Sequence, residues 1–180
     1  MKKLSIIIPV YNEEETFLDL LARVIAAPSS GMEKEVIIID DCSTDKTPQI
    51  IEELKKDWRK FFTVKTGKKQ GIQDFKEPSF VFLKNEKNSG KGYSIRRGIE
   101  ECTGDIILIQ DADLEYNPFE YPRLLTPILD GRADVVYGSR FLGDTRRVLY
   151  FWHFIANKIL TTFSNIFTDL NMSDMETCYK

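Results

Sequence analysis

The run VIIIDD at residues 36–41 joins four β-branched residues to two carboxylates. A short run that is apolar at every position predicts a strand covered on both faces, as the strands of parallel sheets are. Residues 4–8 (LSIII) and 106–109 (IILI) are similarly rich in leucine and isoleucine. The chain therefore carries several strands that we expect to be buried.

Amphipathic segments lie between these strands. Residues 16–27 repeat apolar side chains at helical spacing, and Thr47-Pro48, with Asp45 as N-cap, opens a helix that runs toward Trp58. Further helices are expected at 94–102 and 119–129, further strands at 79–83 and 134–137, and a long surface loop at 65–78. The alternation predicts an α/β fold in which a mostly parallel, Rossmann-like sheet carries helices on both faces.

The composition is that of one ordinary globular domain. Of the 180 residues, 42% are hydrophobic and 29% are charged, with only 7 Pro and 10 Gly, which excludes disordered and collagen-like classes. The apolar run near the N-terminus is too short for a signal peptide, and no segment reaches the ~20 apolar residues of a membrane span. The net charge of -3 argues against a general polyanion binder, so no nucleic-acid partner is expected.

Histidine and cysteine usage narrows the chemistry further. The single histidine, His153, excludes an HExxH zinc site and any site built from several histidines. Cys42, Cys102 and Cys178 are odd in number and far apart. That pattern is typical of reduced thiols in the cytosol, not of a disulfide framework.

Carboxylates follow two of the predicted strands. Asp40-Asp41 ends one, and Asp111-Ala112-Asp113 follows another. In doubly wound sheets the carboxyl ends of the strands form the ligand crevice. A divalent cation bound by Asp111 and Asp113 would offset their mutual repulsion and bridge the phosphate oxygens of a nucleotide ligand. The alternative is that such residues only cap the following turn or helix.

Five short segments then occur in a characteristic order: PVYNE at 9–13, DDCSTDKT at 40–47, NSGKG at 88–92, DADLE at 111–115 and GSR at 138–140. In this order and spacing, and over residues 4–180, the chain resembles glycosyltransferase family 2, whose members are inverting nucleotide-sugar enzymes of GT-A fold. The likeness is greatest to the dolichyl- or polyprenyl-phosphate hexosyltransferases, the mannose- and glucose-phosphate lipid synthases.

The resemblance implies roles for the matching positions. The positions implied to bind the nucleotide sugar are Pro9, Tyr11, Glu13, Asp41 and Ser43, and Lys91 and Ala112 are further candidates for the same role. Asp111 and Asp113 are implied to hold Mg²⁺ or Mn²⁺ against the diphosphate, and Glu115 stands where relatives place a further metal contact, often Gln. For Pro9 and Tyr11, packing at the end of a strand remains the alternative.

Gly90-Lys91-Gly92 brings a glycine turn to the start of a predicted helix. It is not a P-loop, because Asn85 and Gly92 stand where that motif requires Gly and Ser or Thr. A glycine turn at a helix N-terminus still approaches a phosphate or a sugar. A purely structural start of the helix is the alternative.

An amphipathic segment covers residues 145–168, with no acidic residue between Asp144 and Asp169. It carries Arg146, Arg147 and Lys158, and Trp152, Ile155, Ile159, Phe163 and Ile166 recur at helical spacing. Aromatic and apolar residues with basic neighbours predict a helix that lies in the interface of an anionic membrane. An ordinary core helix over the sheet is the alternative.

The resemblance also implies an acceptor side. Arg140 is expected to face the phosphates or the acceptor, and His153 falls where relatives carry an arginine that contacts phosphate; a core histidine is the alternative. Residues 171–180 resemble a further family motif, whose acid lies beside the reaction centre and whose basic residue faces the phosphates. Asp174 and Lys180 hold those positions.

The sequence therefore predicts a single GT-A catalytic domain over residues 1–180, with a nucleotide-sugar half at 1–115 and an acceptor side at 116–180, and incomplete at its C-terminus relative to the family. The predicted activity is metal-dependent transfer of a hexose from UDP- or GDP-hexose to polyprenyl or dolichyl phosphate, catalysed on the cytoplasmic face of a membrane. Such an acceptor is already anionic and needs no general base.

Three alternatives remain open. For a sugar-hydroxyl acceptor, Asp174 would be the general base. The chain could instead bind nucleotide sugars without turnover. A phosphoacceptor signalling domain fits worst, since Asp111 lies too far beyond Asp40-Asp41 in the sequence for that compact layout.

Overall fold

The computed structural model describes residues 2–66, 77–138, 151–175, 177 and 179. The chain divides into two compact units, Met1–Pro122 and Arg123–Lys180. Each unit is described by itself below.

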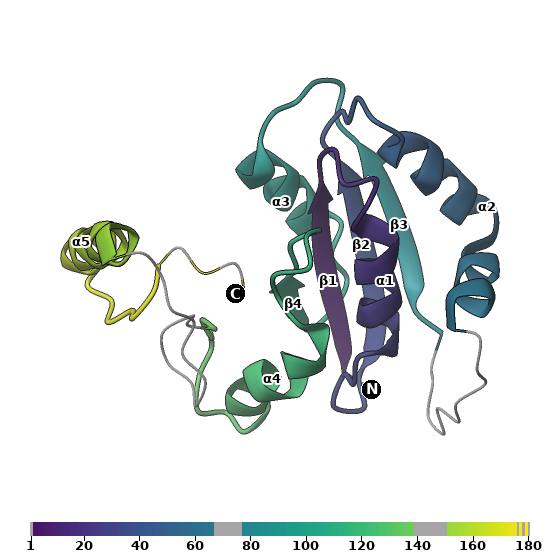
Figure 1. Cartoon of the computed structure of the whole chain (residues 1–180). Coiled ribbons are helices and arrows are strands. Elements are labelled where there is room, and N and C mark those ends of the chain that lie inside the picture. The colour runs from purple at the N-terminus through teal and green to yellow at the C-terminus, as the bar shows by residue number, and fades with distance from the viewer. Residues whose placement is uncertain (1, 67–76, 139–150, 176, 178, 180) are drawn as a thin grey trace. The chain divides into compact units, whose positions relative to one another are not determined.

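The first unit is built on a four-stranded sheet (Figure 1). Its strands are β1 (Lys3–Val10), β2 (Glu33–Asp40), β3 (Ser79–Lys84) and β4 (Ile106–Ile109). They lie in the order β3-β2-β1-β4, and every neighbouring pair is parallel. All four strands therefore end at the same edge of the sheet, which confirms the predicted parallel α/β arrangement.

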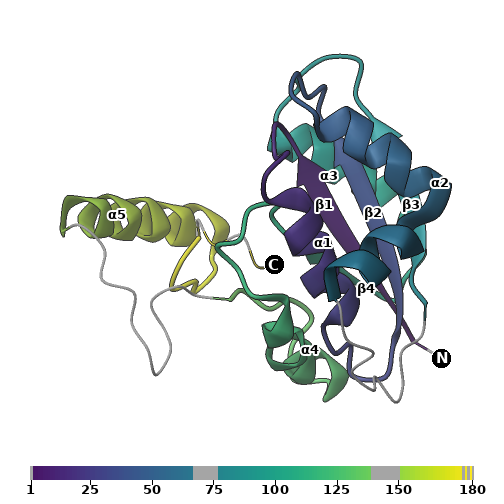
Figure 2. The ribbon, with the colours of Figure 1, turned by 45° about the vertical axis from the view of Figure 1, so that its right-hand side comes forward.

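Helices cover both faces of this sheet (Figure 2). The helices α1 (Phe17–Ala26) and α2 (Thr47–Thr66) lie on one face, and α3 (Lys91–Glu100) lies on the other. On the α3 side the core contains Ile7, Ile37 and Ile39. A Cβ atom at Gly98 would lie 2.7 Å from the side chain of Ile7, so only glycine lets α3 approach the sheet this closely.

Local sequence features explain the buried face of α1 and the start of α2. The buried residues of α1 fall one helical turn apart, at Phe17, Leu20, Leu21, Val24 and Ile25. Asp45 Oδ1 accepts a hydrogen bond of 2.9 Å from the backbone N–H of Thr47 at the start of α2, as expected of a capping carboxylate. Asp57 interrupts α2 with non-helical dihedral angles (φ -161, ψ 86), next to the predicted end of this helix at Trp58.

Two of the predicted segments have different outcomes. The strand predicted at 134–137 is wrong, since these residues have no strand conformation. Val135 is 66% exposed, and a strand needs repeated pairing with a neighbour, which an apolar composition does not supply by itself. Of the predicted surface loop at 65–78, residues 67–76 lie outside the described residues.

The chain enters the second unit through a short 3₁₀ turn (Pro118–Glu120) and α4 (Tyr121–Leu129), and this unit also contains α5 (Phe151–Thr168). The helix α5 confirms the helical character of the predicted amphipathic segment over 151–168; residues 145–150 lie outside the described residues. In the described part of the chain, none of the helices combines the length and the apolar character that crossing a bilayer requires.

Candidate active site

A pocket with a volume of about 210 Å³ opens at the edge of the sheet where the parallel strands end. Its lining comes from the ends of β1, β2 and β4 and from the first turn of α3: Pro9, Val10, Tyr11, Glu13, Asp41, Lys91, Ser94, Asp111, Ala112 and Asp113. From β1 the chain passes to β2 and then to β3 on one side of the sheet, and the connection from β3 crosses back to place β4 on the other side of β1. Open α/β sheets bind ligands at such a switch point.

Asp41 holds the loop that precedes α3. Its carboxylate accepts hydrogen bonds from Asn85 Nδ2 at 2.6 Å and from the backbone N–H groups of Ser89 and Gly90 at 2.9 and 2.7 Å. Burial alone would raise the pKa of Asp41, but these hydrogen bonds stabilise the charged form and keep the pKa below its usual range. Asp41 therefore lines the pocket as an ionised side chain that also fixes the position of a second lining segment.

Lys91 carries the positive charge of the pocket. Its Nζ forms an ion pair with Asp111 Oδ1. The lysine side chain is 47% exposed, whereas the Asp111 side chain is only 12% exposed. The neighbouring Gln110 is fully buried, and its Oε1 accepts a hydrogen bond of 2.9 Å from Tyr121 OH, so the chain is anchored immediately before Asp111.

Asp113 experiences the opposite environment from Asp41. Burial and the negative charges of Asp111 and Glu115 raise the pKa of Asp113, despite opposing effects of the Glu115 backbone N–H and of Lys91. Asp113 Oδ1 accepts that N–H at 3.0 Å. The side chain of Glu115 is exposed and does not line the pocket. This end of the pocket thus holds more negative charge than its surroundings neutralise.

The carboxylates that line the pocket suit a divalent cation that is shared with a ligand. Among the described residues, no group of three or more His, Cys, Asp or Glu side chains is arranged to hold a metal by itself. Mg²⁺ in enzymes commonly uses one or two carboxylates and completes its coordination with substrate phosphates and water. Asp111 and Asp113 in the same pocket provide two such carboxylates, and the raised pKa of Asp113 is the effect that a cation would offset.

Hydrogen bonds between two loops support the part of the pocket that Tyr11 and Glu13 line. Ser43 Oγ accepts from the Asn12 backbone N–H at 3.0 Å, and Thr47 Oγ1 accepts from the Glu13 backbone N–H at 3.0 Å. Asn12 Oδ1 accepts from the Thr44 backbone N–H at 2.8 Å. Ser43 lies in this contact between loops and not among the residues that line the pocket.

The remaining predicted site residues belong to the second unit or lie outside the described residues. Asp174 and His153 belong to the second unit. There Asp174 is buried and 3.5 Å from Asn157 Nδ2, while His153 is an exposed residue of α5. Arg140 and Lys180 lie outside the described residues.

Some further residues of the site follow strand ends or lie beside a predicted site residue, so the sequence also indicated them. Asn85 follows the end of β3, and the strand-end reasoning that selected Asp41 and Asp111 applies to it equally. Ser94 lies one turn after Lys91 on α3 and lines the same pocket. Gln110 follows the end of β4 in the same way, but its partner Tyr121 is identified only by the folded structure.

Comparisons with known proteins agree with this geometry. The family described as "Glycosyl transferase family 2" matches residues 5–179. A dolichol-phosphate mannosyltransferase of Pyrococcus furiosus is 31% identical over 140 residues, which are 78% of this chain and 34% of that protein. The chain thus spans about a third of the length of this relative.

Solved structures give the same result for the fold. Residues 1–349 of S. aureus TarS in complex with UDP match with a TM-score of 0.54 and 26% identity over 82% of this chain and 38% of that one. The complex of the same protein with UDP-GlcNAc matches with a TM-score of 0.50 and 27% identity over 72% of this chain and 31% of that one. The predicted GT-A fold is confirmed, and the chain belongs to glycosyltransferase family 2.

Proposed function

We propose that the protein is a metal-dependent inverting glycosyltransferase that moves a hexose from a UDP- or GDP-hexose to polyprenyl or dolichyl phosphate. The observation that carries this proposal is one pocket at the carboxyl edge of the sheet, lined by Asp111, Asp113 and Lys91 together with Tyr11, in a chain of family 2. The similarity to a dolichol-phosphate mannosyltransferase supports the lipid-phosphate acceptor.

In this proposal the donor occupies the pocket with its base toward the end of β1. Pro9, Tyr11 and Glu13 line that part, and Tyr11 is 45% exposed, so its ring has surface available for a base or a ribose. Asp41 and Ser43 hold the two loops that border the donor. TarS with bound UDP-GlcNAc supports a nucleotide sugar as the ligand class.

The diphosphate lies between Lys91 and the two carboxylates. Asp111 and Asp113 would hold Mg²⁺ or Mn²⁺, with Glu115 as a further candidate ligand, and a bound ion would supply positive charge against the departing nucleoside diphosphate. Lys91 and the backbone around Ala112 border the same phosphates. Arg140, in the family motif, is proposed to face the phosphates from the acceptor side.

The acceptor attacks the anomeric carbon from the face opposite the leaving group. A new bond forms between this carbon and an oxygen of the lipid phosphate, and the bond to the nucleoside diphosphate breaks. Since a phosphate oxygen is already anionic at neutral pH, no side chain must remove a proton. His153 and Lys180 are proposed to contact that phosphate, and Asp174 to lie beside the reaction centre.

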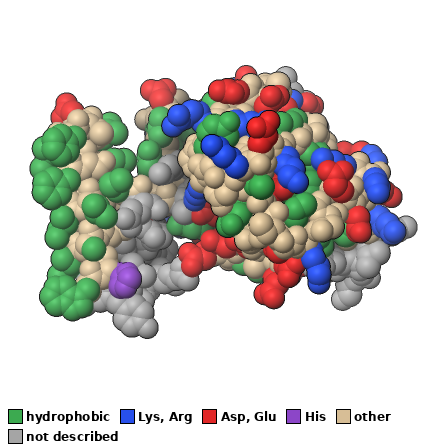
Figure 3. Space-filling model, turned by 90° about the horizontal axis from the view of Figure 1, so that it is seen from above, with side chains coloured by type: hydrophobic (Ala, Val, Ile, Leu, Met, Phe, Trp, Pro, Cys, Tyr) green, Lys and Arg blue, Asp and Glu red, His purple; other side chains and the backbone are tan. Residues whose placement is uncertain are grey.

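This assignment extends to the organisation of the chain. We place the nucleotide-sugar half at 1–115 and the acceptor side at 116–180 within one catalytic domain. The acceptor is a lipid, so the protein is proposed to associate peripherally with the cytoplasmic face of an anionic membrane. Hydrophobic side chains gather along α5 (Figure 3), where Trp152 is 73% and Phe167 83% exposed, and flotation with anionic liposomes at low salt tests this membrane association.

The decisive experiment separates binding from transfer. UDP- and GDP-hexoses are first screened by thermal shift and calorimetry with and without Mn²⁺, and the donor that binds is then incubated with dolichyl phosphate or with a glycan carrying free hydroxyl groups. We expect metal-dependent binding and hexose transfer to the lipid phosphate. Binding without transfer to either acceptor would identify a nucleotide-sugar-binding module, and transfer to the glycan would make Asp174 the candidate base.

A further inference from the structure

The structure fixes the start of α3 unusually firmly. The Asp41 carboxylate accepts the backbone N–H groups of both Ser89 and Gly90, directly before the helix begins at Lys91. Gly90 has a φ angle of 84°, a left-handed conformation that glycine adopts without strain. The Cα atom of Lys91 is therefore held in place by the backbone of the loop, and its side chain leaves from a fixed point at the rim of the pocket.

A lysine is an unfavourable choice for this position. The N-terminus of a helix carries partial positive charge, which favours acidic residues in the first turn and disfavours basic ones. The first turn of α3 contains no acidic residue and begins with Lys91. A residue that opposes its local structural preference indicates a role outside that local structure.

That role is given by the partner of the lysine. Nζ of Lys91 pairs with Asp111 Oδ1, one of the two carboxylates that line the same pocket. Asp111 is largely buried whereas Lys91 remains half exposed. The acidic partner is thus fixed, and the lysine is the member of the pair whose long side chain can move to another anion.

We propose that Lys91 is an internal counterion that occupies Asp111 until ligands arrive, and that it transfers to the diphosphate when a divalent cation takes its place on the carboxylates. This inference rests on the proposed function. Without a nucleotide, the cation has to displace Lys91 from Asp111, and the lysine gains no phosphate in exchange. With the diphosphate present, Lys91 gains a new anionic partner, so each ligand favours the binding of the other.

The test measures Mn²⁺ binding in the absence of nucleotide, by calorimetry or by the electron paramagnetic resonance signal of free Mn²⁺. Lys91→Met removes the competing charge, and we expect it to strengthen binding of Mn²⁺ alone by about ten-fold. The same variant should weaken UDP or GDP binding at saturating Mn²⁺ by about ten-fold. Lys91→Arg keeps the charge and should retain weak binding of Mn²⁺ alone.

Lys87→Met is the matched control, because Lys87 is an exposed lysine of the same loop that does not line the pocket. It should leave both affinities unchanged. If Lys91→Met does not bind Mn²⁺ alone more tightly than the wild type, the counterion role is wrong, even where the wild type binds metal and nucleotide together. If the wild type binds neither UDP nor GDP with Mn²⁺, the proposed function fails instead, while a gain of Mn²⁺ affinity in Lys91→Met would still support the counterion role.

Discussion

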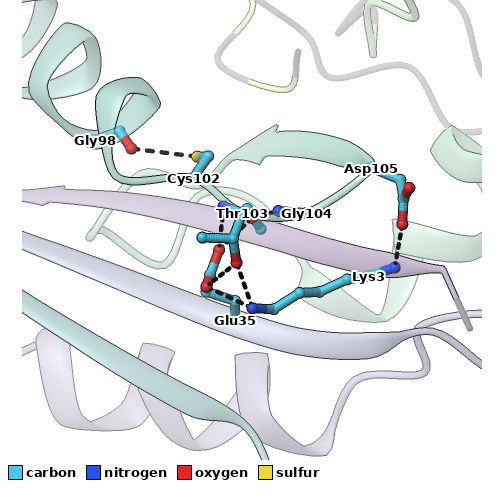
Figure 4. A network of polar contacts seen from close by, with 8 residues as sticks. Lys3, Glu35, Gly98, Cys102, Thr103, Gly104 and Asp105 are labelled. Atoms are coloured by element: carbon cyan, nitrogen blue, oxygen red, sulfur yellow. Dashed lines mark hydrogen bonds and ion pairs between the residues drawn. The ribbon is translucent and has the colours of Figure 1, made fainter.

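Two carboxylates at opposite edges of one sheet, Glu35 and Asp113, lie in opposite environments. At the amino edge, Glu35 is buried and accepts hydrogen bonds from Lys3 Nζ at 2.7 Å, from Ser5 Oγ at 2.6 Å, and from the backbone and side chain of Thr103 at 2.9 and 2.7 Å (Figure 4). At the carboxyl edge, Asp113 shares a pocket with three other carboxylates, among them Asp111, and with Lys91. The charge of Glu35 is thus satisfied by hydrogen bonds, whereas Asp113 is crowded by other carboxylates.

The pKa values of Glu35 and Asp113 differ accordingly. Burial alone would raise the pKa of Glu35, but hydrogen bonds from Lys3, Ser5 and Thr103 outweigh it and lower the pKa to about 2. For Asp113, burial and the charges of Asp111 and Glu115 raise the pKa. A carboxylate whose charge the protein stabilises supports the fold, and one whose charge the protein leaves uncompensated is prepared for a ligand. Substitutions of Glu35 and Asp113 test whether the first supports the fold and the second binds a ligand.

The largest effect is expected from Asp113→Asn on ligand binding. The amide removes the negative charge that would hold the cation, so metal-dependent nucleotide affinity should fall by about 1,000-fold, below detection in a calorimetric titration. Glu35→Gln is the control from the other edge and should leave the affinity unchanged. Equal loss of affinity in both variants would mean that the pocket responds to general destabilisation and not to its own carboxylates.

The next largest effect is expected from Glu35→Gln on stability. The amide cannot replace a buried carboxylate that receives four hydrogen bonds from Lys3, Ser5 and Thr103, so the free energy of unfolding should fall by about 3 kcal/mol. Urea denaturation followed by circular dichroism measures it. Thr103→Val, which removes only one of the hydroxyl partners, should cost about 1 kcal/mol. A loss below about 1 kcal/mol in Glu35→Gln would show that the network contributes little to the fold.

The pH dependence of the unfolding free energy tests the lowered pKa of Glu35. The folded pKa of Glu35, about 2, lies below its usual value of 4.5, so its contribution is fully present above about pH 4.5 and is lost as the pH falls toward 2. More than half of it, roughly 2 kcal/mol, should be lost by pH 3. The difference in unfolding free energy between the wild type and Glu35→Gln should narrow by that amount between pH 6 and pH 3. A difference that stays constant over this range would contradict the depressed pKa.

The sequence predicts the strands that form both edges of the sheet, but only some of the interactions that the carboxylates at these edges make. The runs at 36–39 and 106–109 identify strands correctly, because short segments made only of leucine, isoleucine and valine are typical of parallel strands. Burial of the whole run is confirmed only for 36–39, since Ile107 in β4 is 38% exposed. The apolar run at 134–137 misleads for the complementary reason, since composition does not provide a strand to pair with. Strand-end reasoning brought Asp41 and Asp111 to one pocket because parallel strands end at one edge.

The partners of these carboxylates could not be predicted in the same way. Thr103 lies 68 residues from Glu35 in the sequence, and Ser89 lies 48 residues from Asp41. No local pattern links such pairs, because their contact depends on the register of the sheet and the path of its loops. The sequence therefore identifies acidic residues at strand ends, but the fold decides which of them are satisfied.

The smallest expected effect is the most direct test of the comparison. Asp113→Asn removes a negative charge that its surroundings destabilise, as the raised pKa of Asp113 indicates. The unfolding free energy at neutral pH should therefore stay the same or rise, by no more than about 1 kcal/mol. Chemical denaturation of the wild type and the variant at the same pH, without divalent cations, measures the difference. Glu35→Gln, which changes a carboxylate to the same amide, should move stability in the opposite direction. If Asp113→Asn instead destabilises the protein by more than 1 kcal/mol, Asp113 supports the fold as Glu35 does, and the division of tasks between the two edges is lost.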